Sequence, residues 1–351
     1  MTMMRATVLR NGSFATEMRQ RPQPGPGEVL VKVRSCGICG SDLHLFRHQR
    51  DTIEKARSLG ADVSELERGY SQGVVLGHEF VGEIVDFGSD TQRTLKVGDR
   101  VVSMPFVVKG GAPVLIGSNP ETSGAYAQYM TLTEATLLKV DPAIANEAAA
   151  FVEPLGIAVH AVNKSGITPG ATAAIVGAGP IGLAIIAVLR DRGIETIVAS
   201  DLSPTRRRLA LTMGASEAVN GAEASAVAKA AVPGKPLFVF ENTGAPGMLH
   251  RLVLEAPQNA KLVVTGIAPG EESFLPMVAI MKELSMTFVI YYTQEEFAHA
   301  LDLIGSGKFD WRAMHTGTVG LSGIPGAFAD LRDPEQHAKI LIDPWLEAEA
   351  G

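Results

Sequence analysis

The sequence predicts an α/β protein of two domains, one rich in β-strands and one built on a doubly wound parallel sheet. A chain of 351 residues exceeds the roughly 250–300 residues at which a single core stops growing. Short strand patterns fill its first part, and strand and helix patterns alternate from Ala171 onward. We expect residues 1–155 and 300–351 to form the β-rich domain and residues 156–299 the parallel-sheet domain.

Short strands are predicted through the first part of the chain. The segment 28–34 (EVLVKVR) alternates in character and follows a Pro/Gly-rich turn at 22–27. Segments 80–87 (FVGEIVDF) and 100–104 (RVVSM) have a similar pattern, with a turn at 96–99 between them. Such a run of short strands favours a barrel-like domain.

In the second part of the chain, strand and helix patterns alternate as in βαβ units. Strands and helices should alternate there and form a parallel sheet with helices on both faces. The strands are predicted at 173–176, 195–200, 238–241 and 261–265, and the helices at 181–192 and 204–213.

The first strand-to-helix turn of this βαβ pattern has the sequence G-x-G-x-x-G. Gly177 permits a tight turn, Gly179 lets the backbone approach a pyrophosphate, and Gly182 lets helix and strand pack closely. Pro180 and Ile181 open the helix, whose N-terminus offers free N–H groups and a positive dipole end to phosphates. Its place between a strand and a helix favours a dinucleotide site over a merely tight turn.

Asp201 ends the second strand of the βαβ pattern, about 20 residues after the glycine loop, where a carboxylate can bind the ribose hydroxyls of NAD. It is also a candidate cap of the next helix, and both roles are compatible. Arg206, Arg207 and Arg208 follow, and a nearby arginine can accept the additional phosphate of NADP. We interpret these arginines mainly as solvated helix charges and predict NAD as the cofactor.

Candidate metal ligands occur in three places in the first part of the chain. The segment 36–44 (CGICGSDLH) combines thiol, hydroxyl, carboxylate and imidazole groups, and His78, Glu79 and Glu153 follow. Zinc takes such ligands, and a catalytic zinc keeps one position for water or substrate. Two alternatives stay open: the C-x-x-C of this segment as a redox pair, and Glu153 as a helix cap.

Several motifs occur in a fixed order along nearly the whole chain: CGICGSDLH, GHEFVGEIVDFG, VGDRVVS, GAYAQY, EPLGIAVHAV and VGAGPIGL. In this order the chain resembles the medium-chain zinc-dependent alcohol and polyol dehydrogenases, especially the branch with sorbitol, threonine and butanediol dehydrogenases. The resemblance implies a GroES-like catalytic domain and a Rossmann domain. It implies reversible hydride transfer between a secondary alcohol, diol or polyol and NAD, by a homodimer or homotetramer.

The resemblance also implies roles for single residues. Cys39 and His78 would bind zinc directly. Glu79 and Glu153 would bind it directly or through water, exchanging during turnover.

Three further residues of the 36–44 segment receive roles in the same way. Ser41 would meet the substrate hydroxyl, and His44 would continue a proton path. Asp42 would orient a metal ligand from the second shell. Ser41, His44 and Glu153 are therefore the catalytic residues that the resemblance implies.

The chain departs from the family pattern at two points. Segment 103–123 contains no cysteine, where many relatives hold a structural zinc with four. We therefore predict one catalytic zinc per chain and no structural zinc. Residues 45–73 form an insertion between metal-ligand segments, in which 51–59 (DTIEKARSL) is predicted as a helix capped by Asp51. The insertion is either a lid, or a surface elaboration or subunit contact.

Composition narrows location and partners. The net charge of -7 is spread along the chain, which argues against a nucleic-acid or anionic-membrane surface. No apolar run reaches the roughly 18–20 residues of a membrane span, and the first residues lack a signal-peptide core. Two cysteines allow no disulfide framework and favour the cytoplasm. The competing functions are a zinc-free quinone or enone reductase on the same fold and a nucleotide-binding protein without turnover; the ligand set argues against both.

Overall fold

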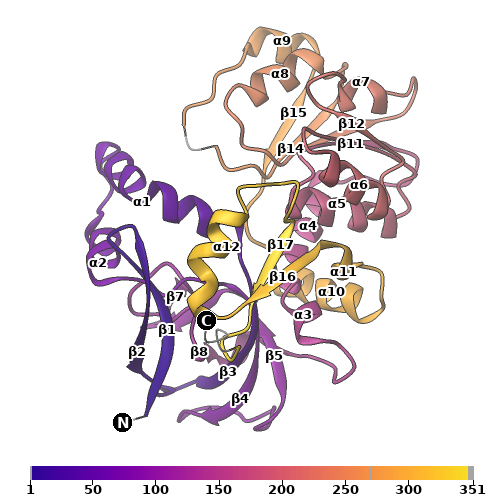
Figure 1. Cartoon of the computed structure of the whole chain (residues 1–351). Coiled ribbons are helices and arrows are strands. Elements are labelled where there is room, and N and C mark those ends of the chain that lie inside the picture. Colours follow the sequence, from indigo (N-terminus) through magenta and orange to yellow (C-terminus); the bar gives the residue numbers. More distant parts are fainter. Residues whose placement is uncertain (1, 269, 347–351) are drawn as a thin grey trace. The chain divides into compact units, whose positions relative to one another are not determined.

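The computed structural model describes residues 2–268 and 270–346, which divide into two compact units (Figure 1). Unit 1 contains the described chain up to Glu153, His315–Arg332 and the described chain from Lys339. Unit 2 contains Pro154–Met314 and Asp333–Ala338. Unit 1 is rich in strands and unit 2 holds a parallel sheet, so the α/β class predicted from the sequence is confirmed.

The main sheet of unit 1 is built around β3 (Glu28–Gly37). This strand pairs antiparallel with β4 (Glu79–Phe87), β8 (Tyr129–Thr133) and β17 (Lys339–Ile342). Paired strands lie along both edges of β3, and its inward-facing side chains are buried, as expected of a central strand. The sheet continues from β4 through β5 (Arg100–Ser103) to β9 (Leu137–Lys139), and from β17 to β16 (His315–Val319), which runs parallel to β17.

Smaller elements complete unit 1. Two hairpins are antiparallel pairs, and the second occupies the cysteine-free segment 103–123. The hairpins are β1 (Met3–Arg10) with β2 (Ser13–Gln20) and β6 (Phe106–Lys109) with β7 (Ala112–Leu115); the helices are α1 (Gly40–Ser58), α2 (Ser64–Gln72), η1 (Glu134–Thr136), α3 (Asn146–Ala149), η2 (Leu321–Gly323) and α12 (Ile324–Asp330).

The insertion forms an arm of α1 and α2, drawn in indigo and violet in Figure 1. The expected helix at 51–59 is confirmed to Ser58, but the expected cap was wrong. Asp51 lies inside α1, which starts at Gly40 and is interrupted only by a non-helical residue, His48. Helical sequence continues from the metal-ligand segment through the arm, so no new helix start is needed at Asp51.

The sheet of unit 2 is parallel throughout, in the order β12-β11-β10-β13-β14-β15. This order is that of a dinucleotide-binding doubly wound sheet, with the glycine loop following its first strand, β10. Strands β10 and β13 are buried at every residue, as apolar runs covered by helices on both faces should be. The strands are β10 (Thr172–Val176), β11 (Thr196–Asp201), β12 (Glu217–Asn220), β13 (Leu237–Glu241), β14 (Lys261–Val264) and β15 (Ser285–Phe288).

Helices flank this sheet, and the last two in chain order pack at one end of the unit (Figure 1). The helices are α4 (Val152–Ser165), α5 (Pro180–Asp191), α6 (Pro204–Thr212), α7 (Ala226–Ala230), α8 (Met248–Glu255), α9 (Pro276–Met281), α10 (Gln294–Gly305) and α11 (Trp311–Met314). His160 of α4 lies 2.7 Å from Glu296 of α10, which keeps α10 in this unit. In the described ranges, no helix has the length and apolar character needed to cross a membrane.

Candidate metal and nucleotide sites

The start of α1 places the metal-ligand segment at the edge of the unit 1 core. Cys39 is the N-cap residue of this helix, and its backbone N–H donates to Oδ2 of Asp42 at 3.2 Å. An acidic side chain in the first turn stabilises the helix by accepting a free backbone donor. The same bond ties the Cys39 backbone to a carboxylate that is itself held in place.

Asp42 is buried and joins three elements of unit 1. The hydroxyl of Tyr126 donates to Asp42 Oδ2 at 2.8 Å, and His78 Nδ1 lies 3.5 Å from Oδ1. Burial alone would raise the pKa of Asp42, but the charge and hydrogen bond of His78 and the hydrogen bond of Tyr126 lower it below its usual value. Asp42 therefore remains a carboxylate and fixes the ring of His78.

His78 turns its other nitrogen toward the start of α1. Its Nε2 lies 3.4 Å from Oγ of Ser41, and its ring also interacts with the side chain of Cys39. Burial lowers the pKa of His78, but the negative charges of Asp42 and Cys39 outweigh it and raise that pKa well above its usual value. A carboxylate behind Nδ1 of a ring that also lies beside a thiol is the arrangement by which proteins orient a histidine for a metal.

Glu79 lies next to His78 in sequence but is already engaged. Both of its carboxylate oxygens accept from Nζ of Lys339, at 2.8 and 2.6 Å, and Lys339 also donates to the backbone oxygen of Ile38 at 3.0 Å. Burial lowers the pKa of Lys339, but the charges of Glu79, Cys39 and Glu153 outweigh it, so the pKa is raised. Sequence analysis did not identify Lys339, because its partner lies 260 residues away.

Glu153 is buried at the start of α4. Its charge acts on Lys339 together with those of Cys39 and Glu79, so the charged groups predicted as ligands surround one ammonium group. Throughout the part of the chain described, no three His, Cys, Asp or Glu side chains are placed to hold a metal together. Cys39 and His78 lie side by side, whereas Glu79 faces Lys339.

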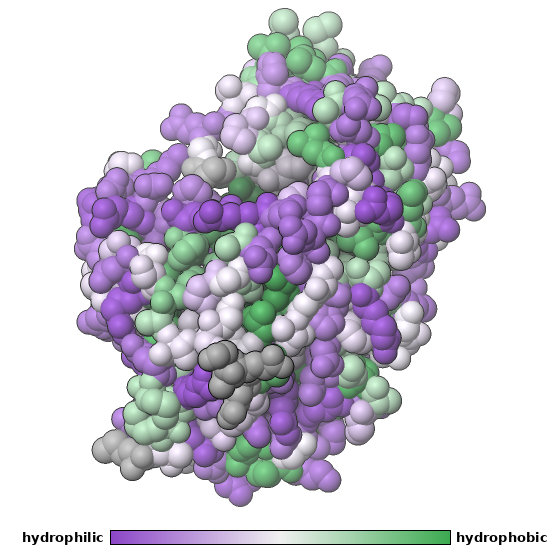
Figure 2. All heavy atoms as spheres, in the orientation of Figure 1, coloured by the Kyte–Doolittle hydropathy of each residue, from purple (hydrophilic) through white to green (hydrophobic). Residues whose placement is uncertain are grey.

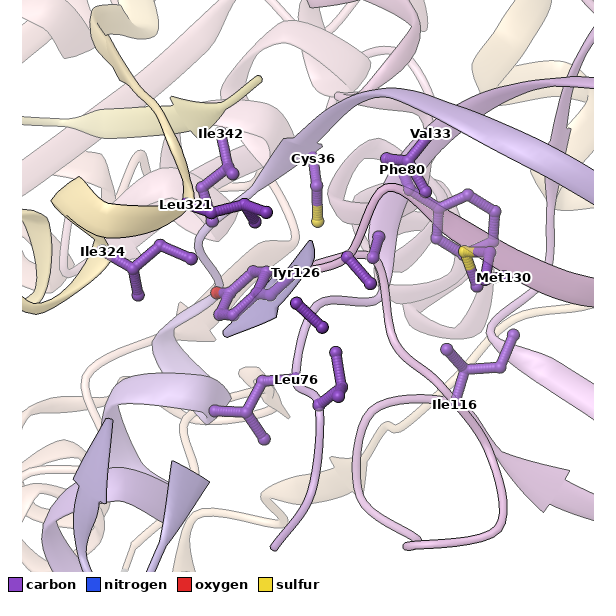
Figure 3. Close-up of a cluster of buried hydrophobic side chains, with 14 of the residues drawn as sticks. Val33, Cys36, Leu76, Phe80, Ile116, Tyr126, Met130, Leu321, Ile324 and Ile342 are labelled. Carbon is purple, nitrogen blue, oxygen red and sulfur yellow. The ribbon is translucent and has the colours of Figure 1, made fainter. Parts of the chain in front are cut away.

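Cys36 takes no part in this cluster. It is fully buried in β3, and its sulfur points into the apolar core beside Tyr126 and Leu321 (Figure 3). Burial, together with the charges of Asp42 and Glu79, raises the pKa of its thiol well above the usual value. Cys36 and Cys39 are both free thiols. A buried, protonated thiol is a packing residue, not a nucleophile.

His44 lies one turn beyond Ser41 on α1, with His48 one turn further. The two imidazole rings are 4.9 Å apart between centroids, and His48 Nδ1 lies 3.4 Å from Asp51 Oδ2. Burial, with the charge of His48, lowers the pKa of His44 below its usual value. His48 belongs to no sequence motif, and the arm alone brings it to His44.

The glycine loop of unit 2 has the tight geometry that its pattern predicts. Gly177 has φ of +90°, and a Cβ there would lie 2.6 Å from Thr243 Cγ2. A Cβ on Gly182 would lie 2.0 Å from the backbone oxygen of Gly177. Gly179 is the N-cap residue of α5, and Pro180 is its first residue. Only glycine fits at the first two contacts, which fix the tight turn that leads into the N-terminus of α5.

Asp201 and Arg206 flank this loop. Asp201 Oδ2 accepts from the backbone N–H of Ala178 at 2.9 Å, and Oδ1 accepts from that of Ser203 at 2.9 Å. Nη1 of Arg206 lies 4.0 Å from the position that a Cβ on Gly179 would take, and Nε of Arg206 is buried without a hydrogen-bond partner. A carboxylate and a guanidinium group therefore both border the loop.

The chain matches two family models. Residues 25–142 match the family described as "Alcohol dehydrogenase GroES-like domain", and residues 180–306 match "Zinc-binding dehydrogenase". The chain is 30% identical over 336 residues to (R,R)-butanediol dehydrogenase of Bacillus subtilis (strain 168), covering 93% of this chain and 95% of that protein. It belongs to the zinc-dependent medium-chain alcohol and polyol dehydrogenases.

Other relatives extend this likeness. A probable D-xylulose reductase A of Aspergillus clavatus is 31% identical over 356 residues, covering 93% of this chain and 95% of that protein. The crystal structure of the Bacillus subtilis 2R,3R-butanediol dehydrogenase superposes with a TM-score of 0.83 at 29% identity, covering 97% of this chain and 99% of that one. A putative zinc-binding dehydrogenase from Sinorhizobium meliloti 1021, bound to NADP, has a TM-score of 0.83 at 26% identity, covering 98% and 100%.

This dehydrogenase is accordingly an oxidoreductase that interconverts alcohols and carbonyl compounds with zinc and a nicotinamide cofactor. The donors around His78 fit zinc, because a thiol and an imidazole oriented by a carboxylate are the ligand types that zinc takes. The glycine loop fits the pyrophosphate, because the position of a Cβ on Gly179 at the start of α5 is open, with Arg206 Nη1 at 4.0 Å as its nearest neighbour.

Proposed function

We propose that this dehydrogenase oxidises a secondary alcohol, diol or polyol with NAD, reversibly, using one zinc ion per chain. The observation that carries the proposal is His78: its Nδ1 lies beside the buried Asp42, its Nε2 lies beside Ser41, and its ring interacts with Cys39. The substrate class is that of the relatives named as butanediol dehydrogenase and D-xylulose reductase. Cytoplasmic location is part of the proposal, since both cysteines are free thiols.

Cys39, His78 and Glu153 are the zinc ligands in this proposal. Glu79 acts beside them as the partner of Lys339 and exchanges with Glu153 only when that pair opens. The two cysteines of the chain are too few for a structural site of four. One zinc per chain follows from these two arguments.

Each residue of the first turn of α1 has a distinct task in the reaction. When bound, zinc polarises the alcohol oxygen and the nicotinamide accepts the hydride. Asp42 keeps His78 in one orientation. The hydroxyl of Ser41, beside His78, receives the hydrogen bond of the substrate hydroxyl. His44, whose lowered pKa keeps it neutral, accepts the proton that leaves.

NAD rather than NADP follows from Asp201. Its carboxylate closes the end of β11 beside the glycine loop, where the ribose hydroxyls bind and where a phosphate would be repelled. Arg206 is the residue that opposes this preference, because its guanidinium group lies near Gly179. We give Asp201 the larger effect, since it is fixed by two backbone N–H groups.

A homodimer or homotetramer is also proposed, with the edge of the unit 2 sheet as the contact. β15 is the edge strand, and α9 beside it exposes large apolar side chains, seen in green at the top of Figure 2. Ile280 is 74% exposed. Two copies related by a twofold axis would pair these edges and cover the apolar surface.

The test is an activity panel with metal analysis on the same preparation. NAD reduction with secondary alcohols, diols and polyols should depend on bound zinc and disappear when a chelator removes it. Reduction of quinones or enones by metal-free protein, with no alcohol oxidised by the zinc form, would overturn the proposal and favour the zinc-free reductase.

A further inference from the structure

Polar side chains form one stripe along α1, from the metal-ligand end of the helix into the arm. Ser41, His44, His48 and Asp51 follow each other at spacings of three or four residues, which places them on the same helix face. The stripe starts beside His78, because Ser41 Oγ lies 3.4 Å from its Nε2. It ends on the surface, because the side chain of Asp51 is 76% exposed.

The outer members of the stripe, His44, His48 and Asp51, lie close together. The ring centroids of His44 and His48 are 4.9 Å apart, with the planes tilted by 39°. Nδ1 of His48 lies 3.4 Å from Oδ2 of Asp51. The side chain of His48 is 44% exposed, so its other nitrogen reaches water. The non-helical conformation of His48, φ of −125°, occurs at the residue where the stripe passes into the arm.

Two arginines of the arm are engaged with α2. Arg50 donates to the hydroxyl of Tyr70 of α2 at 3.2 Å, and Arg57 pairs with Glu67 of α2. Asp51 is the carboxylate recorded beside His48. The positive charge of His48 in turn lowers the pKa of His44, so the two rings share one proton more readily than they hold two.

We propose that His48, held by Asp51, takes the proton of the alcohol from His44 and releases it to solvent. This inference rests on the proposed function and extends the proton path into the arm, beyond the residues to which the resemblance gives roles. The carbon of the alcohol gives a hydride, with both electrons of its C–H bond, to the nicotinamide. The hydroxyl proton passes to His44, then directly or through one water to His48, then to bulk water.

Every step of this path conserves charge and protons. His48 accepts and releases the proton at Nε2, since its Nδ1 lies beside Asp51, and both rings are neutral again after each turnover. One proton reaches solvent for each carbonyl group formed. During reduction of the carbonyl group, the proton follows the same path from solvent to the substrate. Asp51 stabilises the transient charge on His48 in both directions.

Coupling of the two rings is tested first, by NMR titration of the imidazoles in protein without metal or cofactor. His48→Gln should raise the pKa of His44, since it removes a neighbouring positive charge. The matched control is His299→Gln, at an exposed position of α10, which should leave the pKa of His44 unchanged. An unchanged pKa of His44 in His48→Gln would overturn the inference, whatever the activity.

Proton release is tested second, by stopped-flow with a pH indicator during alcohol oxidation. In dilute buffer His48→Gln should release the proton about tenfold more slowly, less than the usual effect of a direct acid–base group because water partly replaces it. Concentrated MOPS, too bulky to ligate the metal readily, should restore the rate, whereas a folding defect would not respond. Equal release by wild type and His48→Gln would overturn the inference and leave the proposed function intact. Absence of alcohol oxidation by the wild type would overturn both.

Discussion

Lys339 donates to both carboxylate oxygens of Glu79, at 2.8 and 2.6 Å, and neither side chain is more than 2% exposed. The two residues come from β17 and β4 and are 260 residues apart in the chain. A buried pair of this kind holds its partners in place but is costly to break, since either charge alone is left in a low-dielectric interior.

The stability of unit 1 should depend on this pair. Lys339→Met leaves the Glu79 carboxylate buried without its partner and should lower the free energy of unfolding by about 3–5 kcal/mol. Adding Glu79→Gln to that variant removes the second charge and should recover part of the loss. Urea unfolding measures both. A loss below about 1 kcal/mol in Lys339→Met would show that water reaches Glu79.

Cofactor preference should follow Asp201. Because its carboxylate borders the glycine loop, kcat/KM should be higher with NAD than with NADP. Asp201→Ala should lower the ratio of these two kcat/KM values by about tenfold, equivalent to about 1.4 kcal/mol. Arg206→Ala is the matched variant and should raise it. Steady-state kinetics with both cofactors gives the ratios. Equal efficiency of the two cofactors with the wild type would refute the role of Asp201.

The arm should affect substrates more than stability if it acts as a lid. Replacing residues 54–67 by a short Gly-Ser linker keeps Ile53 and Tyr70 and removes one buried apolar side chain, Val63. The free energy of unfolding should fall by no more than about 2 kcal/mol, the value of that burial. KM should change across a series of alcohols of increasing size. Unchanged kinetics across the series would favour a surface elaboration.

Assembly should depend on the exposed face of α9. Ile280→Asp places a charge in the proposed contact and should convert the oligomer to smaller species in sedimentation velocity, with the fold kept by circular dichroism. Leu211→Asp, on the exposed surface of α6, is the control and should not change the mass. An unchanged mass for Ile280→Asp would place the contact elsewhere.

How much the sequence predicts differs between the two sites. The nucleotide loop is local: Gly177 to Gly182, with Asp201 one strand later, carries its geometry in its own spacing, and the structure has the tight turn expected. The cluster around His78 depends on contacts far apart in sequence, such as Tyr126 with Asp42 and Lys339 with Glu79. No periodic pattern in the sequence predicts side-chain pairs that are so far apart in the chain.

The structure of the arm was also only partly predictable from the sequence. Asp51 fits the residue preferences of a helix cap, and a window centred on it favours a helix start. The helix instead begins at Gly40, with Cys39 as its N-cap, and reaches Asp51 with one non-helical residue, His48, in between. His48 has no motif of its own, and its position beside His44 follows only from that continuity.

The central claim is that Cys39 is a zinc ligand and Cys36 a packed thiol. Cys39 lies at the start of α1 beside His78, whereas Cys36 is fully buried in β3. Cys39→Ser replaces a thiolate by a weak hydroxyl ligand, and Cys36→Ser changes only the packing of the core. NAD affinity should be kept in both, since the glycine loop and Asp201 belong to unit 2.

The deciding measurement is zinc content with alcohol turnover in these two single variants, by elemental analysis of dialysed protein. Wild type and Cys36→Ser should hold about one equivalent and remain active, as a single four-ligand site requires. Cys39→Ser should lose most of its zinc and its turnover together. Equal loss of activity in both variants, with zinc unchanged, would contradict the account and indicate a redox pair of cysteines.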